Sequence, residues 1–313
     1  MNPLHVIIGA GPLGASVARS LLERGQRVRI VTRSGSRPLE NVEALAADVR
    51  TAPGAVKAVA GASVVYQCAQ PPYHRWAAEF PQLQKSILDV AATAGADLVL
   101  ADNLYAYGDP EGEVMVESTP ERATTTKGVV RRTMAQDALA AHAAGRLRVA
   151  TTRPSNYFGP GYDLTGTTVF AKALLGKPMQ FLIRGDQPHS FSFVPDAGAA
   201  MAAIGTSEHG WGQTWITSIQ SPMTQQEFAE RIWSAAGQTG TAKTSYVSEG
   251  LLRFAGLFSP AIRAAVEMTY EYDRPFIASS AAFEEAFGMH PTPLDEAITA
   301  TLRAYAPERV TAP

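Results

Sequence analysis

A glycine-rich loop, Gly9-Ala10-Gly11-Pro12-Leu13-Gly14, stands near the N-terminus between an apolar run and an amphipathic segment. In such a loop Gly9 permits a tight turn, Gly11 lets the backbone approach a pyrophosphate, and Gly14 lets the next helix pack closely. Pro12 and Leu13 would open that helix, whose unpaired N–H groups and positive dipole end attract phosphates. The residues predict a dinucleotide-binding site; the alternative is a turn that serves packing alone.

The end of the second predicted strand bears on the choice of cofactor. NAD sites usually end this strand with Asp or Glu, whose carboxylate holds the ribose 2′-hydroxyl. Here the strand runs through Thr32 into Arg33 and Ser34, and no acidic residue follows before Glu40. A planar guanidinium and a nearby hydroxyl suit a ribose 2′-phosphate, so NADP(H) is the favoured cofactor. The alternative is that Arg33 belongs to a solvated basic turn.

Composition excludes several classes of protein. The 313 residues include 27 Lys and Arg against 29 Asp and Glu, a net charge of −2, which offers no electrostatic grip on nucleic acid or an anionic membrane. One cysteine, Cys68, allows no intrachain disulfide. The six histidines lack paired ligand spacing, so no metal site is expected. No membrane span or signal peptide is recognisable, and we expect a soluble, cytoplasmic protein.

Alternating short β-rich runs and amphipathic segments fill the first half of the chain. The predicted strands are Leu4–Ile8, Arg27–Thr32, Asn41–Asp48, Ser63–Cys68, Asp97–Ala101 and Arg148–Thr152, and the predicted helices are Leu13–Arg24, Trp76–Ala94 and Lys127–Ala144. This alternation indicates an α/β fold with a doubly wound parallel sheet. We expect a cofactor domain over residues 1–155 and a smaller substrate lobe over 156–313, with a segment at about 196–220 returning to the sheet.

Three further motifs carry a family resemblance: Tyr107-Gly108, Arg153-Pro154-Ser155-Asn156-Tyr157-Phe158-Gly159-Pro160 and Phe193-Val194-Pro195-Asp196. With the glycine loop, they resemble the extended short-chain dehydrogenase/reductases, the NAD(P)-dependent epimerase/dehydratase superfamily, across most of the chain. The resemblance implies a Rossmann-type cofactor domain with a small C-terminal substrate lobe. Homodimers are common in that family.

The resemblance also implies positions for cofactor contacts. It places Asp48 and Val49 near the adenine, and Ala69 and Gln70 near the cofactor ribose. Pro154, inside the longest matching motif, would lie against the cofactor as well.

The family's catalytic residues are replaced. Members use a Tyr-x-x-x-Lys pair on the helix after Tyr-Gly, and the corresponding positions here are Lys127 and Arg131. The family's Ser or Thr that polarises the substrate carbonyl corresponds to Asn103. The chain therefore resembles an atypical member.

The replacement residues suggest their own chemistry. Lys127 and Arg131 share a helix face, where burial and like charge disfavour the charged lysine, so Lys127 would exchange a proton near neutrality. Arg131 would hold ribose hydroxyls, Asn103 would donate to an oxyanion, and Tyr105 would be a relocated acid. The alternative is that Lys127 and Arg131 begin a helix on a solvated face.

Several residues are candidates for contact with a substrate. They are Tyr73, Trp76, Tyr107, Asn156, Tyr157 and His189. Tyr73 and Trp76 would wall an apolar pocket, although aromatic residues at a helix start also serve as core. His189 would line the far side of the pocket or make a structural hydrogen bond.

Three functions follow. The first is an NADP(H)-dependent oxidoreductase that reduces a carbonyl or related group of a small organic molecule. The second is a sugar or nucleotide-sugar epimerase or dehydratase, which the family makes plausible but the missing tyrosine argues against. The third is a non-catalytic NADP(H)-binding sensor or scaffold. No residue pattern identifies one substrate.

Overall fold

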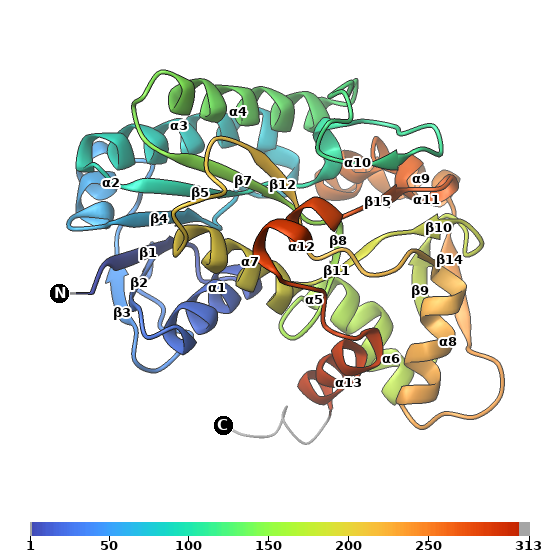
Figure 1. The fold of residues 1–313 in the computed structure, drawn as a ribbon. Coiled ribbons are helices and arrows are strands. Elements are labelled where there is room, and N and C mark those ends of the chain that lie inside the picture. The colour runs from blue at the N-terminus through green and yellow to red at the C-terminus, as the bar shows by residue number, and fades with distance from the viewer. Residues whose placement is uncertain (1, 307–313) are drawn as a thin grey trace.

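The computed structural model describes residues 2–306, and its centre is a seven-stranded parallel sheet (Figure 1). The strand order is β12-β7-β5-β4-β1-β2-β3. The strands are β1 (Leu4–Ile8), β2 (Arg27–Thr32), β3 (Glu43–Ala46), β4 (Val64–Gln67), β5 (Asp97–Ala101), β7 (Val149–Arg153) and β12 (Thr214–Ile216). The doubly wound parallel sheet that the sequence predicts is confirmed.

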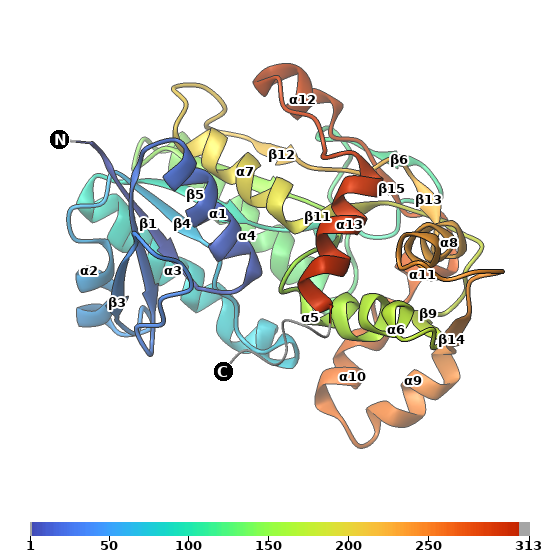
Figure 2. The ribbon, with the colours of Figure 1, turned by 90° about the horizontal axis from the view of Figure 1, so that it is seen from below.

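Helices cover both faces of this sheet, so its central strands are apolar along their whole length. All five residues of β1 are buried. On one face lie α2 (Ala52–Val59), α3 (Trp76–Ala94) and α4 (Thr126–Ala143), and on the other α1 (Pro12–Glu23) and α7 (Val194–Gly205) (Figures 1 and 2). Alternate strand residues serve the two cores: Val6 and Ile8 face the α2–α4 side, and Ile7 faces the α1–α7 side.

The strand order reverses between β1 and β4. The chain moves outward from β1 through β2 to β3, and then returns to β4 on the opposite side of β1. The loops that leave the carboxyl ends of β1 and β4 therefore diverge and open a crevice, where ligands of open α/β sheets bind.

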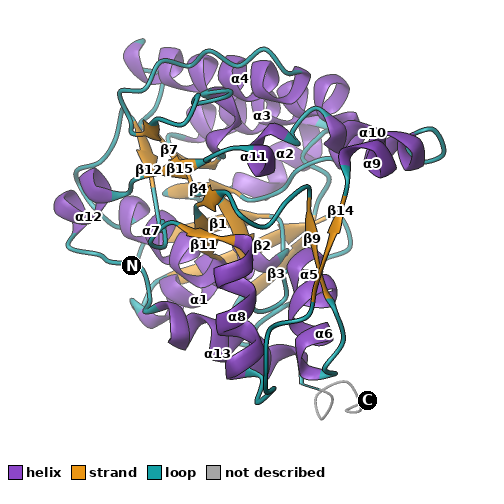
Figure 3. Cartoon of the chain, turned by 90° about the vertical axis from the view of Figure 1, so that its right-hand side faces the viewer, coloured by secondary structure: helices purple, strands orange, loops and turns teal. Residues whose placement is uncertain are grey.

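A second lobe is built mostly from residues beyond 155 (Figures 2 and 3). Its elements are β8 (Asn156–Phe158), α5 (Asp163–Thr165), a π-helical turn (Gly166–Phe170), α6 (Ala171–Leu174), β9 (Met179–Leu182), β10 (Pro188–His189), β11 (Phe191–Phe193), β13 (Met223–Thr224), α8 (Gln225–Ala235), β14 (Thr244–Val247), α9 (Glu249–Gly256), α10 (Pro260–Val266), α11 (Tyr270–Asp273), β15 (Ile277–Ala278), α12 (Ala281–Phe287) and α13 (Leu294–Tyr305). Its core packs Phe158, Phe170 and Phe228 against α13.

The lobe contains pairings that the sequence did not predict. β8 pairs with β11 in parallel, β9 with β14, and β15 with β6 (Val114–Met115) of the first half. These strands are two to four residues long and pair across gaps of more than 30 residues, so they leave no periodic signal of their own. Helices α9, α10 and α11 are likewise short and were not predicted.

No helix within residues 2–306 combines the length and apolar character needed to cross a membrane.

Replacing Gly198 by Ala should destabilise the fold. At this position α7 packs directly on α1, and an added Cβ would lie 2.5 Å from the Ser16 Cβ. Overpacking of this kind costs about 1–3 kcal/mol, measurable as a lower free energy of unfolding in urea. Gly250→Ala is the matched control, since nothing lies within 4 Å of a Cβ there and alanine favours helix α9. Equal stability of the two variants would contradict the direct α1–α7 packing.

Candidate functional site

A cavity of about 940 Å³ lies at the carboxyl ends of the central strands. Its walls are the loops after β1, β4 and β5, the ends of β2 and β3, and, from the second lobe, the segment from α9 to α11. This volume is near the upper end of the roughly 300–1,000 Å³ of ligand pockets. It therefore offers room for a large ligand with a smaller one beside it.

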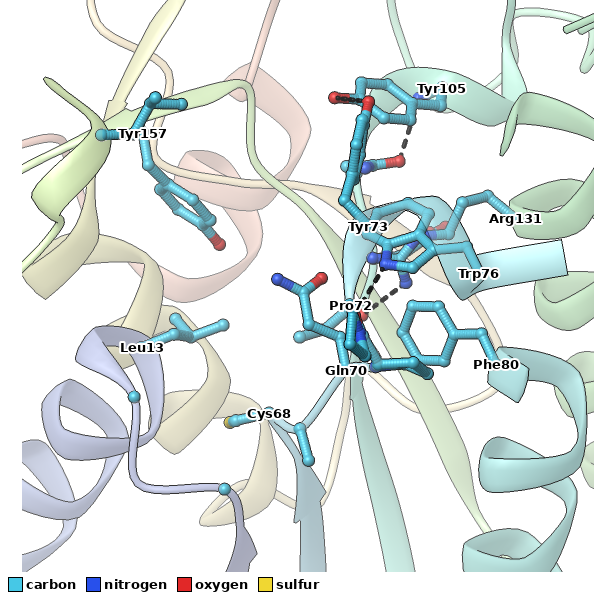
Figure 4. A pocket seen from close by; sticks show the side chains of 18 of the residues that line it. Leu13, Cys68, Gln70, Pro72, Tyr73, Trp76, Phe80, Tyr105, Arg131 and Tyr157 are labelled. Carbon is cyan, nitrogen blue, oxygen red and sulfur yellow. Dashed lines mark hydrogen bonds and ion pairs between the residues drawn. The ribbon is translucent and has the colours of Figure 1, made fainter. Parts of the chain in front are cut away.

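Side chains from opposite walls point into this space (Figure 4). Leu13 and Tyr157 lie on one side, and Tyr73 and Trp76 on the other, with the Gln70 side chain reaching in between. Gln70 follows β4, so the loop after this strand forms the floor between the two lobes.

The glycine loop has the close contacts that its spacing predicts. Gly9 has φ +110, and an added Cβ would lie 2.8 Å from the Ala69 backbone nitrogen. At Gly14 a Cβ would lie 2.0 Å from the Gly9 carbonyl oxygen. Gly11 is different, because nothing lies within 4 Å of its Cβ position and it lines the cavity. Gly9 and Gly14 thus shape the loop, and Gly11 leaves its cavity side bare.

The first turn of α1 suits a diphosphate. Pro12 occupies the first helical position, Gly11 provides no side-chain cap, and the first turn contains no acidic residue. The N–H groups of Leu13 and Gly14 have no intrahelical acceptor, because the first turn of any helix lacks one. An anion at this helix terminus would receive these hydrogen bonds and the favourable end of the helix dipole. The residues present therefore fit a dinucleotide.

Two arginines stand at the β2–β3 end of the cavity. Arg33 is exposed and lines the cavity with Thr32, whereas the Ser34 hydroxyl contacts the Ser36 hydroxyl outside it. Arg50 is paired with Asp48 at 2.6 Å, and hydrogen bonds from Arg50 lower the pKa of that carboxyl to about 2. Asp48 is paired with Arg50, and Glu79, which also lines the cavity, is paired with Arg75, so Arg33 keeps an unpaired positive charge among the described residues.

A buried carboxylate organises the centre of the site. Asp102, directly after β5, lies 2.8 Å from Arg153 Nε and 3.5 Å from Arg131 Nε. Arg131 also donates to the Ala101 carbonyl at 3.1 Å, and its guanidinium stacks 4.4 Å from the Trp76 ring. Arg131, which the sequence predicts to hold ribose hydroxyls, is thus held rigidly in the cavity wall, and its charge is compensated.

Lys127 does not line the cavity. Its ammonium group lies 2.9 Å from Glu267 Oε1, donates to the Ala264 carbonyl and covers the Tyr73 ring at 4.4 Å. Glu267 also accepts hydrogen bonds from the backbone N–H groups of Thr126 and Lys127, so it caps α4. The expected repulsion between Lys127 and Arg131 is offset, because each cation has its own carboxylate. Lys127 therefore joins the two lobes and does not reach the cavity.

Asn103 and Tyr105 do line the cavity. The Asn103 side-chain oxygen accepts from the Tyr105 N–H at 3.2 Å and caps the short 3₁₀ helix Leu104–Ala106, which leaves its amide nitrogen available. The Tyr73 hydroxyl donates to the Tyr105 hydroxyl at 3.3 Å (Figure 4). Burial raises the pKa of both phenols, so both are neutral proton donors.

A buried polar cluster faces them from the second lobe. Asn156 Nδ2 lies 2.9 Å from Glu271 Oε2, 2.8 Å from the Tyr272 hydroxyl and 3.0 Å from His189 Nε2. Burial raises the pKa of Glu271 to about 8 and lowers that of His189 to about 4, so near neutral pH both groups are mainly uncharged. Glu271 and Tyr272 are not among the residues that the sequence predicts for the site, because nothing in the segment 270–272 distinguishes a buried carboxyl group from an exposed one.

The cavity brings together most residues that the sequence singled out. Those lining it are Gly9, Gly11, Pro12, Leu13, Thr32, Arg33, Asp48, Val49, Ala69, Gln70, Tyr73, Trp76, Asn103, Tyr105, Arg131, Pro154, Asn156 and Tyr157. Those outside its lining are Gly14, Ser34, Tyr107, Lys127 and His189. Tyr107 is buried with its ring 4.7 Å from the Arg153 guanidinium, and His189 makes a structural hydrogen bond to the Glu271 carbonyl.

No group of three or more His, Cys, Asp or Glu side chains in residues 2–306 is arranged to hold a metal ion.

Comparison with known proteins gives a family match and many fold matches. Residues 5–214 match the family model described as NAD dependent epimerase/dehydratase family. MoeE5 in complex with UDP-glucose and NAD has a TM-score of 0.78 at 21% identity, covering 99% of this chain and 100% of that one. The Thermus thermophilus UDP-glucose 4-epimerase complex with NAD has 0.75 at 19%, covering 96% and 98%. The Bacillus cereus UDP-glucuronic acid 4-epimerase complex with NAD has 0.79 at 12%, covering 99% and 100%. The search of curated proteins gives no match.

Gly11→Ala should weaken dinucleotide binding without unfolding the protein. The added methyl would meet no protein atom within 4 Å, but it would occupy the side from which a diphosphate approaches. Overpacking of about 1–3 kcal/mol corresponds to a roughly 5- to 150-fold higher Kd, measured by fluorescence titration with NADPH and with NADH. Unfolding in urea should change little, and Gly250→Ala should keep the parent affinity. Unchanged affinity in Gly11→Ala would show that the phosphates of the dinucleotide do not bind at this loop.

Proposed function

The chain belongs to the NAD dependent epimerase/dehydratase family, and from that premise we propose that it binds NADP(H) and reduces a carbonyl or related group of a small organic molecule. The dinucleotide would lie along the cavity from Arg33 and Val49, past the glycine loop, to Gln70 and Pro154. When bound, it supplies a hydride to the substrate. The substrate would occupy the end between the loop after β5 and the second lobe.

Charge supports NADP(H) as the cofactor. Arg33 is exposed at the cavity wall, and no ion pair engages its guanidinium within residues 2–306. The nearby carboxylate of Asp48 is held by Arg50 and so is not available to a ribose 2′-hydroxyl. An exposed guanidinium and a neutralised carboxylate suit a 2′-phosphate. The three structural neighbours named above are complexes with NAD, so this chain would differ from them at this end.

One observation carries the direction of the reaction. The ionisable groups with raised pKa at the substrate end, Tyr105, Tyr157, Tyr272 and Glu271, all favour their protonated forms because of burial. Protonated groups donate protons to a carbonyl oxygen, whereas oxidation of an alcohol needs a group that accepts one. These protonated groups support the proposal of reduction, in which the substrate oxygen gains a proton.

The residues that line the cavity would have separate roles in this reaction. The Asn103 amide N–H would donate to the substrate oxygen and stabilise its developing negative charge. The Tyr105 hydroxyl would transfer its proton to that oxygen, and Tyr73, hydrogen-bonded to it, would restore its proton. Arg131, fixed by Asp102 and Trp76, would hold ribose hydroxyls. Lys127 holds the second lobe against α4 at the edge of this arrangement.

A nucleotide-sugar epimerase or dehydratase is the second candidate. The structural neighbours that bind UDP-glucose or UDP-glucuronic acid favour it. A nucleoside diphosphate would need cations at the substrate end. Among the described lining residues the cations are Arg33, Arg50 and Arg131, of which two stand at the adenosine end and the third is neutralised by Asp102. The uncharged polar groups at the substrate end suit a small organic molecule better than a nucleoside diphosphate.

Arg33→Ala should reduce the preference for NADPH over NADH. Loss of charge-assisted hydrogen bonds to the 2′-phosphate costs about 1.5–3 kcal/mol, so the Kd for NADPH should rise at least about tenfold while that for NADH stays unchanged. Fluorescence titration measures both. Arg37→Ala is the control, since Arg37 is exposed four residues further on and does not line the cavity. Equal weakening of both nucleotides would show that Arg33 does not read the 2′-phosphate.

Tyr105→Phe should slow reduction without affecting cofactor binding. Loss of a general acid lowers kcat by about 10²–10⁴-fold, measured as NADPH absorbance loss with a panel of aromatic aldehydes and ketones. Tyr246→Phe is the control, because its hydroxyl bonds Gln226 outside the cavity. An unchanged kcat in Tyr105→Phe would reject the assignment. Conversion of UDP-glucose to another nucleotide sugar without net consumption of NADPH would instead favour the nucleotide-sugar epimerase or dehydratase.

A further inference from the structure

Glu271 is a buried acid that the steps proposed above do not use. It is 1% exposed and lines the cavity from α11. Its Oε2 accepts from Asn156 Nδ2 at 2.9 Å, whereas its Oε1 is buried with no hydrogen-bond partner among the described residues. A buried polar atom without a partner is rare in native proteins and calls for a ligand or an equivalent group.

Several tyrosines lie near this carboxyl group. Tyr157 and Tyr162 meet edge to face at 5.6 Å, and the Tyr272 ring stacks on His189 at 5.0 Å. Burial, and after it the charge of Glu271, raises the pKa of Tyr105, Tyr162 and Tyr272. These phenols therefore lie within electrostatic range of Glu271.

No protein cation balances Glu271 within residues 2–306. Asn156 is the only side chain in that range that stabilises its ionised form, and the nearby His189 is neutral because burial lowers its pKa to about 4. Lys127 and Arg131 already have carboxylate partners in Glu267 and Asp102. The titratable groups that face Glu271 are Tyr73, Tyr105, Tyr162, Tyr270, Tyr272 and His189.

We propose that the substrate carries an amine, bound as an ammonium ion between the free oxygen of Glu271 and the neighbouring tyrosine rings. An ammonium group supplies a donor to Oε1 and the positive charge that would stabilise the ionised carboxylate. Tyrosine faces attract a cation within about 6 Å of the ring centre, more strongly in a desolvated site. An anionic substrate would face the same carboxyl group and rings with no counter-charge. This inference rests on the proposed function, since it names the substrate class of the same site.

The proposal has a proton signature. Without ligand, burial raises the pKa of Glu271 to about 8, so the carboxyl is mostly protonated at pH 7. An ammonium ion beside it favours the carboxylate. Binding an amine that is already protonated in solution must then release close to one proton per site, and binding an uncharged alcohol must release none.

Isothermal titration calorimetry at pH 7 tests this, with and without saturating NADP⁺. The probes are benzylamine, 2-phenylethylamine and 3-phenylpropylamine, each paired with the alcohol of the same chain length, in phosphate and in Tris buffer. At least one amine should bind at least tenfold more tightly than its alcohol, with a heat that differs between buffers as proton release requires. Glu271→Gln should abolish the preference and the proton release, whereas Glu249→Gln, at a half-buried position on α9 outside the cavity lining, should keep both.

A stability measurement shows that Glu271→Gln reports on the site and not on misfolding. The folded pKa of Glu271 lies above its ordinary value of 4.5, so the stability that the neutral carboxyl provides is fully present below pH 4.5 and is lost as the pH rises to about 8. The substitution should therefore flatten the fall in unfolding free energy between pH 5 and 8.

Two results would overturn the amine proposal: no amine binds more tightly than its alcohol, or the preference survives in Glu271→Gln. Failure of the proposed function can be distinguished from failure of the amine proposal. It would appear as absent NADPH binding in the parent protein, while the amine titrations without nucleotide still decide the ligand class.

Discussion

The buried carboxylate of Asp102 is the interaction on which the site depends. It sits where β5 ends and binds two guanidinium groups, Arg153 from the end of β7 and Arg131 from α4. Arg153 extends the network to Glu121 at 2.6 Å. Removing one member of a buried ion pair leaves an uncompensated charge, which costs about 3–5 kcal/mol. The network therefore fixes the relative positions of β5, β7 and α4 at the edge of the sheet where the cavity opens.

Lys127 is placed differently from Arg131, which Asp102 holds in the cavity wall. Lys127, one turn earlier on α4, does not face the cavity but reaches the second lobe through Glu267 and the Ala264 carbonyl. The same carboxylate caps α4 through two backbone N–H groups. The position where the resemblance places the family's catalytic tyrosine thus joins α10 to the helix α4. The hydroxyl groups near the cavity come instead from Tyr73 and Tyr105 on other elements.

The phenols and the carboxyl group near Tyr73 and Tyr105 are proton donors. Tyrosines from both lobes and Glu271 lie away from water, and burial favours their neutral forms. The positive charge of Arg33 lies at the opposite end, where Asp48 is neutralised by Arg50. The cavity is therefore polarised along its length: one end suits phosphate, and the other suits a small molecule that accepts a proton or carries a positive charge.

The sequence by itself determined the cofactor half of the protein. Strands buried on both faces are continuous apolar runs, and Gly14 packs on the Gly9 carbonyl within the same loop, so β1, the loop and α1 could be predicted locally. Tertiary structure decided how the side chains around the rest of the cavity are arranged. Whether Lys127 faces the cavity depends on Glu267, 140 residues away, and the burial of Glu271 depends on Asn156, 115 residues away. Charge and pKa arise from such distant partners and from exclusion of water, which no local pattern of residues encodes.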